Sequence, residues 1–168
     1  MLTYATLWHQ YEETIMEKIE NCPKVLIIHG PNLNMLWKRE PDIYGKTTLG
    51  DINNELDGIA QRLDLEIDIF QSNHEGEIVD KIQAATTHNA LIINPAAYTH
   101  TSIAIRDALL LLDMPLIEVH LSNIYKREPF RHNSMIADIA TAKICGFGAH
   151  GYTMALEALV GMIQKEEK

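Results

Sequence analysis

The sequence predicts an α/β fold in which one parallel sheet of five strands carries helices on both faces. Short apolar runs typical of buried strands alternate, along residues 24–168, with longer segments whose apolar residues recur at helical spacing. Connections of helical length are those that parallel strands require. A length of 168 residues suits a single domain with a sizeable core.

The predicted strands differ in how they would be buried. Residues 25–28, 90–93 and 116–119 are apolar runs, which indicates strands covered on both faces. Residues 65–70 alternate apolar with acidic side chains, which predicts a strand near a sheet edge. Residues 143–145 make a short last strand.

The predicted helices fill the segments between the strands. Thr48 would cap the first helix together with Asp51, and Thr101 or Ser102 would cap the third. The apolar stripes of the five helices are Leu49, Ile52, Leu56, Ile59 and Leu63; Ile78, Ile82 and Ala85; Ile105, Ala108, Leu109 and Leu112; Met135, Ile136 and Ile139; and Ala155, Leu156, Leu159 and Met162.

This order of elements predicts a flavodoxin-like three-layer sandwich with strand order 2-1-3-4-5. Residues 24–168 would form the single domain. Residues 1–23 would be an N-terminal extension, and the helical spacing of Leu7, Tyr11, Ile15 and Ile19 predicts that it is an amphipathic helix.

Composition excludes several classes of partner. A net charge of −9 argues against nucleic acid, although a local basic cleft could still bind a small anion. No apolar run approaches the roughly 20 residues of a membrane span, and residues 1–22 lack a stretch of signal-peptide type. Cys22 and Cys145 lack metal-type spacing, so we expect no metal or disulfide framework and a cytoplasmic location.

The connection after the first strand is unusually long. Residues 30–45 separate that strand from the next helical pattern, where about 2–6 residues normally suffice. Arg39 and Tyr44 lie within it. A free tyrosine has a pKa of about 10, and bringing it near neutrality takes roughly 4 kcal/mol. A guanidinium about 4 Å away supplies that at an effective dielectric near 20, so this segment could hold a phenolate base.

Polar side chains follow three central strands. In such a sheet, ligands bind beyond the carboxyl ends of the strands. His29 and Asn32 follow the first strand, Asn94 and His100 the third, and His120 the fourth. Each alone has a structural explanation, such as a hydrogen-bonded core histidine or a turn, but together they predict one polar crevice.

Several standard motifs are missing or misplaced. The loop after the first strand lacks the Gly-Lys-Ser/Thr ending of a phosphate-binding loop, and no lysine follows a strand where a Schiff base would form. Residues 146–151 match the glycine spacing of a dinucleotide fingerprint, but they follow the last strand and lack a suitable downstream acid.

Six motifs in order resemble type II 3-dehydroquinate dehydratase over roughly residues 24–165. They are Gly-Pro-Asn-Leu-Asn at 30–34, Arg-Glu-Pro-x-Ile-Tyr-Gly at 39–45, Gln-Ser-Asn-x-Glu-Gly at 71–76, Asn-Pro-x-Ala-Tyr-Thr-His at 94–100, Glu-Val-His-Leu-Ser-Asn at 118–123 and Arg-x-x-Phe-Arg-His at 127–132. The sequence departs from the family at His29, where asparagine is usual, and at Trp37, where glycine is usual.

The resemblance implies a single catalytic domain that dehydrates 3-dehydroquinate to 3-dehydroshikimate through an enolate, without metal or other cofactor, in a homododecamer of four trimers. It implies Tyr44 as base, Arg39 as its stabiliser, His120 as acid and Asn32 as a holder of the enolate oxygen or a water. The implied substrate-binding residues are Asn94, His100, Asp107, Leu121, Ser122 and Arg131.

Three alternatives stay open at this point. The same reaction serves both aromatic amino acid biosynthesis, through the shikimate pathway, and quinate breakdown. The fold also suits a flavodoxin-like domain that binds a flavin or another small ligand. A non-catalytic interaction protein would use residues 1–22 as a docking helix.

Overall fold

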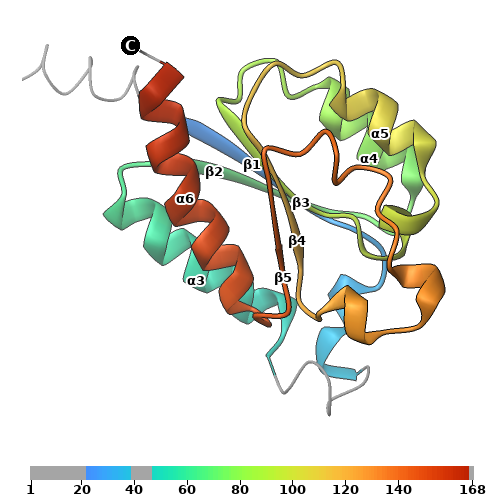
Figure 1. The fold of residues 1–168 in the computed structure, drawn as a ribbon. Helices are drawn as coiled ribbons and strands as arrows, with labels where there is room; N and C mark the ends of the chain where they lie inside the picture. The colour runs from blue at the N-terminus through green and yellow to red at the C-terminus, as the bar shows by residue number, and fades with distance from the viewer. Residues whose placement is uncertain (1–21, 39–46, 167–168) are drawn as a thin grey trace, which may run out of the picture.

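A computed structural model describes residues 22–38 and 47–166. Five parallel strands form one sheet in the order β2-β1-β3-β4-β5, which confirms the predicted topology (Figure 1). The strands are β1 (Lys24–His29), β2 (Glu66–Gln71), β3 (Ala90–Asn94), β4 (Leu116–His120) and β5 (Ala142–Cys145).

Helices cover both faces of the sheet (Figure 1). One face carries α3 and α6, and the other carries α4 and α5. The helices are α3 (Leu49–Arg62), α4 (Glu75–Gln83), α5 (Ile103–Leu109) and α6 (His150–Glu166), with short 3-10 helices η1 (Leu33–Lys38), η2 (Ala96–His100), η3 (Ile124–Lys126) and η4 (Pro129–Arg131). None of these helices is long and apolar enough to span a membrane.

Successive side chains of each strand point to opposite faces of the sheet, which divides the hydrophobic core into two parts. Val25 and Ile27 of β1 pack toward α3 and α6, whereas Leu26 and Ile28 pack toward α4 and α5. This alternation also decides which face each polar residue at a strand end will meet.

The predicted helix caps are mostly confirmed. Thr48 accepts a hydrogen bond from the Asp51 amide, and Asp51 accepts one from the Thr48 amide at 2.8 Å, which completes the capping box. Of the two candidates before α5, Ser102 is the cap, and its hydroxyl accepts from the Ile105 amide. The strand of alternating pattern, β2, lies at the sheet edge as predicted.

The predicted helix through Met135 and Ile139 is wrong. Residues 132–141 form bends and a single turn before β5. The Met135 amide donates to the Thr99 carbonyl at 2.8 Å, and the Ser134 hydroxyl accepts from the Ile136 amide. Because these bonds replace a helical ladder, the apolar residues reach the core from a turn instead.

The connection between β1 and α3 is long, as expected, because α3 begins only at Leu49, and the short 3-10 helix η1 lies within it. Arg39 and Tyr44 lie outside the described residues, as does nearly all of the predicted extension 1–23.

Candidate active site

A cavity of about 150 Å³ opens at the carboxyl ends of β1, β3 and β4. The lining includes seven of the residues predicted from the sequence, namely Asn32, Asn94, His100, His120, Leu121, Ser122 and Arg131. Asp107 does not line it and is exposed on α5. The predicted crevice therefore exists, and one predicted contact falls outside it.

Gly30 lets the loops after β1 and β3 approach closely. A Cβ atom at this position would lie 2.5 Å from the Pro95 carbonyl oxygen, and the Gly30 amide donates to the Asn94 carbonyl at 2.8 Å. Asn32 and Ala96 both have positive φ, at 67° and 52°. Asparagine tolerates that conformation well, whereas alanine does so with strain, which is common at functional sites.

His120 ends β4 inside the cavity and is held by a buried carboxylate. Its Nε2 lies 2.7 Å from Oε1 of Glu118, whose side chain is fully buried. An ionised carboxylate only accepts hydrogen bonds, so Nε2 carries the proton and Nδ1 is the nitrogen available for proton transfer. Burial alone would raise the pKa of Glu118, but His120, Ser134 and Lys143 together hold it below its ordinary value.

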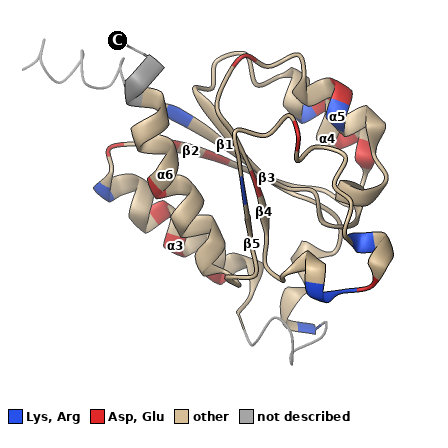
Figure 2. Cartoon of the chain, in the orientation of Figure 1, with Lys and Arg blue, Asp and Glu red and all other residues tan. Residues whose placement is uncertain are grey.

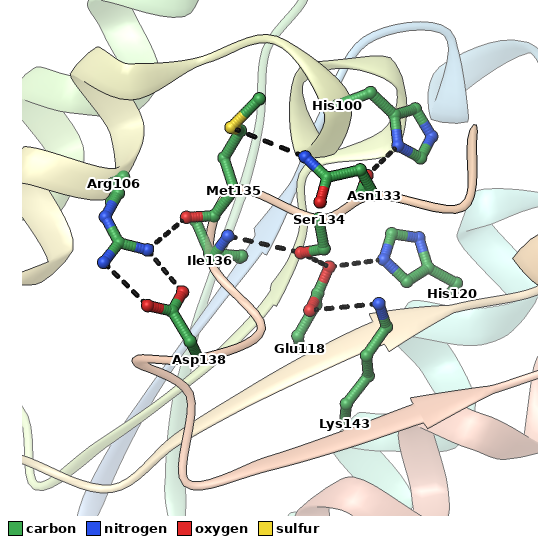
Figure 3. A network of polar contacts seen from close by, with 10 residues as sticks. All are labelled: His100, Arg106, Glu118, His120, Asn133, Ser134, Met135, Ile136, Asp138 and Lys143. Atoms are coloured by element: carbon green, nitrogen blue, oxygen red, sulfur yellow. Dashed lines mark hydrogen bonds and ion pairs between the residues drawn. The ribbon is translucent and has the colours of Figure 1, made fainter. Parts of the chain in front are cut away.

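The irregular segment 132–141 completes this network (Figure 3). The Ser134 hydroxyl donates to Glu118 Oε1 at 2.8 Å. Arg106 fixes the segment from α5, because its guanidinium pairs with Asp138 and donates to the Met135 carbonyl at 2.6 Å. The segment that sequence periodicity assigned to a helix thus supports the histidine of the cavity.

His100 is positioned by the same segment. Its Nδ1 lies 2.7 Å from the Asn133 carbonyl oxygen, so Nδ1 donates and Nε2 is left as an acceptor. Burial lowers the pKa of His100; the bond to Asn133 opposes this, and the charges of His120 and Arg131 lower it further. A neutral His100 can accept a hydrogen bond from a ligand hydroxyl.

The rim of the cavity is basic although the whole chain is acidic. Arg127 and Arg131 both line it, and Arg131 Nε donates to Glu128 at 2.9 Å. Figure 2 shows basic residues on η3 and η4, with the acidic Glu128 between them, and acidic residues spread over the helices. Two guanidinium groups beside an apolar and amide-lined cavity suit a small carboxylate.

His29 turns away from the cavity. Along β1 it shares the face of Val25 and Ile27, so it meets α3 and α6. Its Nδ1 lies 2.8 Å from the Tyr152 hydroxyl, and its Nε2 lies 3.1 Å from Asn53 Oδ1. The prediction that His29 would contribute to the crevice is therefore wrong.

Among the polar residues that line the cavity or lie behind His120, sequence reasoning missed Glu118, Arg127, Ser134 and Lys143. Glu118 had a usable signal, because it lies two residues before His120 in one strand and so shares its face. Ser134 and Lys143 had none, because segment 132–141 and the register of β5 bring them in. Among the described residues, no cluster of three or more His, Cys, Asp or Glu side chains is arranged to hold a metal ion.

The chain is thus a flavodoxin-like α/β protein whose cavity, at the carboxyl edge of the sheet, holds a carboxylate-bound histidine and two arginines. The family model described as dehydroquinase class II matches residues 23–160, and the chain belongs to that family.

Known proteins agree with this membership. A 3-dehydroquinate dehydratase from Francisella philomiragia is 61% identical over 139 residues, which cover 83% of this chain and 95% of that protein. One from Acaryochloris marina is 54% identical, over 86% and 97% of the two chains. The crystal structure of a type II dehydroquinase from Butyrivibrio crossotus matches with a TM-score of 0.80 at 44% identity, over 82% and 97%.

Proposed function

We propose that this chain removes water from 3-dehydroquinate to give 3-dehydroshikimate, as a hydro-lyase of the shikimate pathway. Family membership and two relatives named 3-dehydroquinate dehydratase, each matched over at least 95% of its length, support the reaction. The observation that carries the mechanism is the buried Glu118–His120 pair, which presents one imidazole nitrogen to a cavity with a basic rim.

Two residues would transfer protons. The Tyr44 phenolate, stabilised by Arg39, takes a proton from the carbon next to the ketone, and the electron pair of that bond forms an enolate. Asn32 helps to hold the water or oxygen that stabilises the enolate charge. The His120 imidazolium then gives its Nδ1 proton to the departing hydroxyl, the C–O bond breaks, and a carbon–carbon double bond and water are formed.

The remaining cavity residues would bind the substrate. The charge of Arg131 suits the carboxylate, and Asn94 and neutral His100 suit hydroxyl groups. Leu121 and Ser122 would contribute backbone amides. Asp107 lies outside the cavity of its own chain, so its predicted contact with substrate would need a second copy of the chain.

Three further points stay predictions. We expect residues 24–168 to act as one catalytic domain, the chain to assemble as a homododecamer, and the enzyme to work in the cytoplasm. Exposed apolar side chains on α5 and on the turn after it, Ile103, Leu110 and Leu111, favour assembly of several copies.

The direct test adds 3-dehydroquinate to the purified protein and follows the ultraviolet absorbance of the conjugated enone product. We expect a steady rise with the wild type. We expect none with Tyr44→Phe, which should still bind substrate because only the phenol oxygen is lost. No absorbance change with the wild type would refute the reaction, and substantial turnover by Tyr44→Phe would refute the base.

A further inference from the structure

Lys143 is a buried cation beside the carboxylate that holds His120. The register of β4 and β5 pairs Lys143 with Glu118, so the two side chains project from neighbouring strands (Figure 3). Lys143 Nζ lies 3.5 Å from Glu118 Oε2, and its side chain is only 15% exposed. Within the described residues neither of these two atoms has a hydrogen-bond partner.

The two oxygens of Glu118 therefore meet different groups. Oε1 accepts from His120 and from Ser134, whereas Oε2 faces the Lys143 ammonium. A carboxylate that balances two cations stabilises each of them less than it would stabilise one alone, because the cations repel each other. Because Lys143 and Glu118 are largely buried, this repulsion is poorly screened.

We propose that Lys143 is a positioning residue that acts through Glu118 and makes the His120 imidazolium a stronger acid. The inference extends the role of His120 in the proposed function. Lys143 does not line the cavity, so it tunes the proton donor without touching the substrate.

Other charged groups also face His120. Glu118 lies on its own strand, His100 on η2 and Arg131 on η4, and Arg127 lines the same cavity. All except Glu118 lie on the cavity side and would change substrate binding when substituted. Lys143 lies on the far side of the Glu118 carboxylate from the cavity. A substitution there can change the acid strength of His120 without changing the groups that line the cavity.

The test compares Lys143→Met and Lys143→Gln with wild type in two measurements. The first is the alkaline limb of the pH profile of kcat. The second is the NMR titration midpoint of the His120 imidazole, identified by the signal that disappears in His120→Asn. We expect both to move upward by about one pH unit in each variant, with KM little changed, because loss of the Lys143 charge leaves Glu118 to balance His120 alone.

Two controls separate this effect from a general loss of structure. Lys143→Arg keeps the charge and should restore the wild-type limb and midpoint. Lys81→Met removes an ammonium paired with Asp68 at 2.7 Å, on the α4 side of β2, and should move neither. If Lys143→Met does not fold, Lys143→Gln retains a polar side chain of similar length for the same titration.

Each outcome decides something. An NMR midpoint that stays in place, or moves downward because Glu118 gains a proton when its cation is lost, would overturn the inference. An upward NMR shift without a shift of the kinetic limb would uphold the inference on Lys143 and refute His120 as the acid. These results therefore distinguish failure of the inference from failure of the proposed mechanism.

Discussion

His29 and His120 occupy equivalent places in the sheet but have opposite surroundings. Each is the last residue of a central strand, β1 or β4, and each is at most 5% exposed. His29 meets the uncharged side chains of Tyr152 and Asn53, whereas His120 meets the carboxylate of Glu118. The charge of the partner, and not the position in the fold, therefore distinguishes the two histidines.

The hydrogen bonds around His29 allow one consistent assignment of donors and acceptors. Tyr152 donates to His29 Nδ1, and His29 Nε2 donates to Asn53. This requires a neutral imidazole, and burial indeed lowers the pKa of His29 to about 4. Burial raises the pKa of Tyr152, so its phenol stays protonated. The network is polar, uncharged and suited to fixing a structure.

The largest expected effect is on catalysis through His120. His120→Ala should lower turnover by about a thousandfold, because positioned general acids contribute about 10²–10⁴. Proton abstraction should continue, so the variant should still exchange the substrate α-proton with solvent, as followed by NMR in deuterium oxide. His74→Ala, at an exposed histidine, serves as control. Exchange no faster than that of Tyr44→Phe would contradict the acid assignment.

The next effect should come from Glu118. Glu118→Gln removes the charge that holds the His120 tautomer and leaves Lys143 buried without a counterion. We expect kcat to fall by about a hundredfold and the free energy of unfolding by about 3 kcal/mol. Urea denaturation and steady-state kinetics measure the two losses. Glu66→Gln, which breaks the exposed pair with Lys24, should cost less than about 1 kcal/mol.

His29 should affect stability with a distinct pH dependence. Its pKa is lower in the folded state, so protonation favours unfolding, and stability should fall as pH drops from about 6.5 toward 4. The loss approaches about 3 kcal/mol for a shift of this size. In urea denaturation between pH 7 and 4.5, the unfolding free energy of His29→Asn should lack this His29-dependent decrease. If the unfolding free energy of this variant decreased with falling pH as steeply as that of the wild type, other groups would be the cause of the decrease.

The sequence predicted the sheet and its order because each strand and helix carries a local signal. The apolar runs, the Thr48 cap and the alternation in β2 are all decided within a few residues. The structure predictions failed where contacts with residues distant in sequence determine the local conformation. Segment 132–141 gives up a helix to bind Thr99 and Glu118, and neither partner is near in sequence.

The site was predictable to a similar degree. Residues at or just after strand ends, such as Asn94 and Ser122, reach the cavity as expected. His29 does not, because alternation places it on the face of α3 and α6. Lys143 could not be foreseen, since its contact with Glu118 depends on the register of β5.

The smallest expected effect connects the two regions through Asn94. Tyr152→Phe removes the hydroxyl that donates to His29 and whose pKa the Asn94 side chain lowers, and leaves a buried imidazole nitrogen without its donor. We expect a loss of about 1–3 kcal/mol in unfolding free energy. Because Asn94 lines the cavity, KM should also rise several-fold while kcat stays near the wild-type value.

The matched control for this variant is Tyr125→Phe, which removes an exposed hydroxyl and keeps the ring beside Lys143. It should change neither stability nor KM. If Tyr152→Phe is less stable but has the wild-type KM at a temperature where it is fully folded, the His29 network supports the fold alone. A raised KM would mean that the neutral histidine also serves the site, by holding the amide of Asn94 in place.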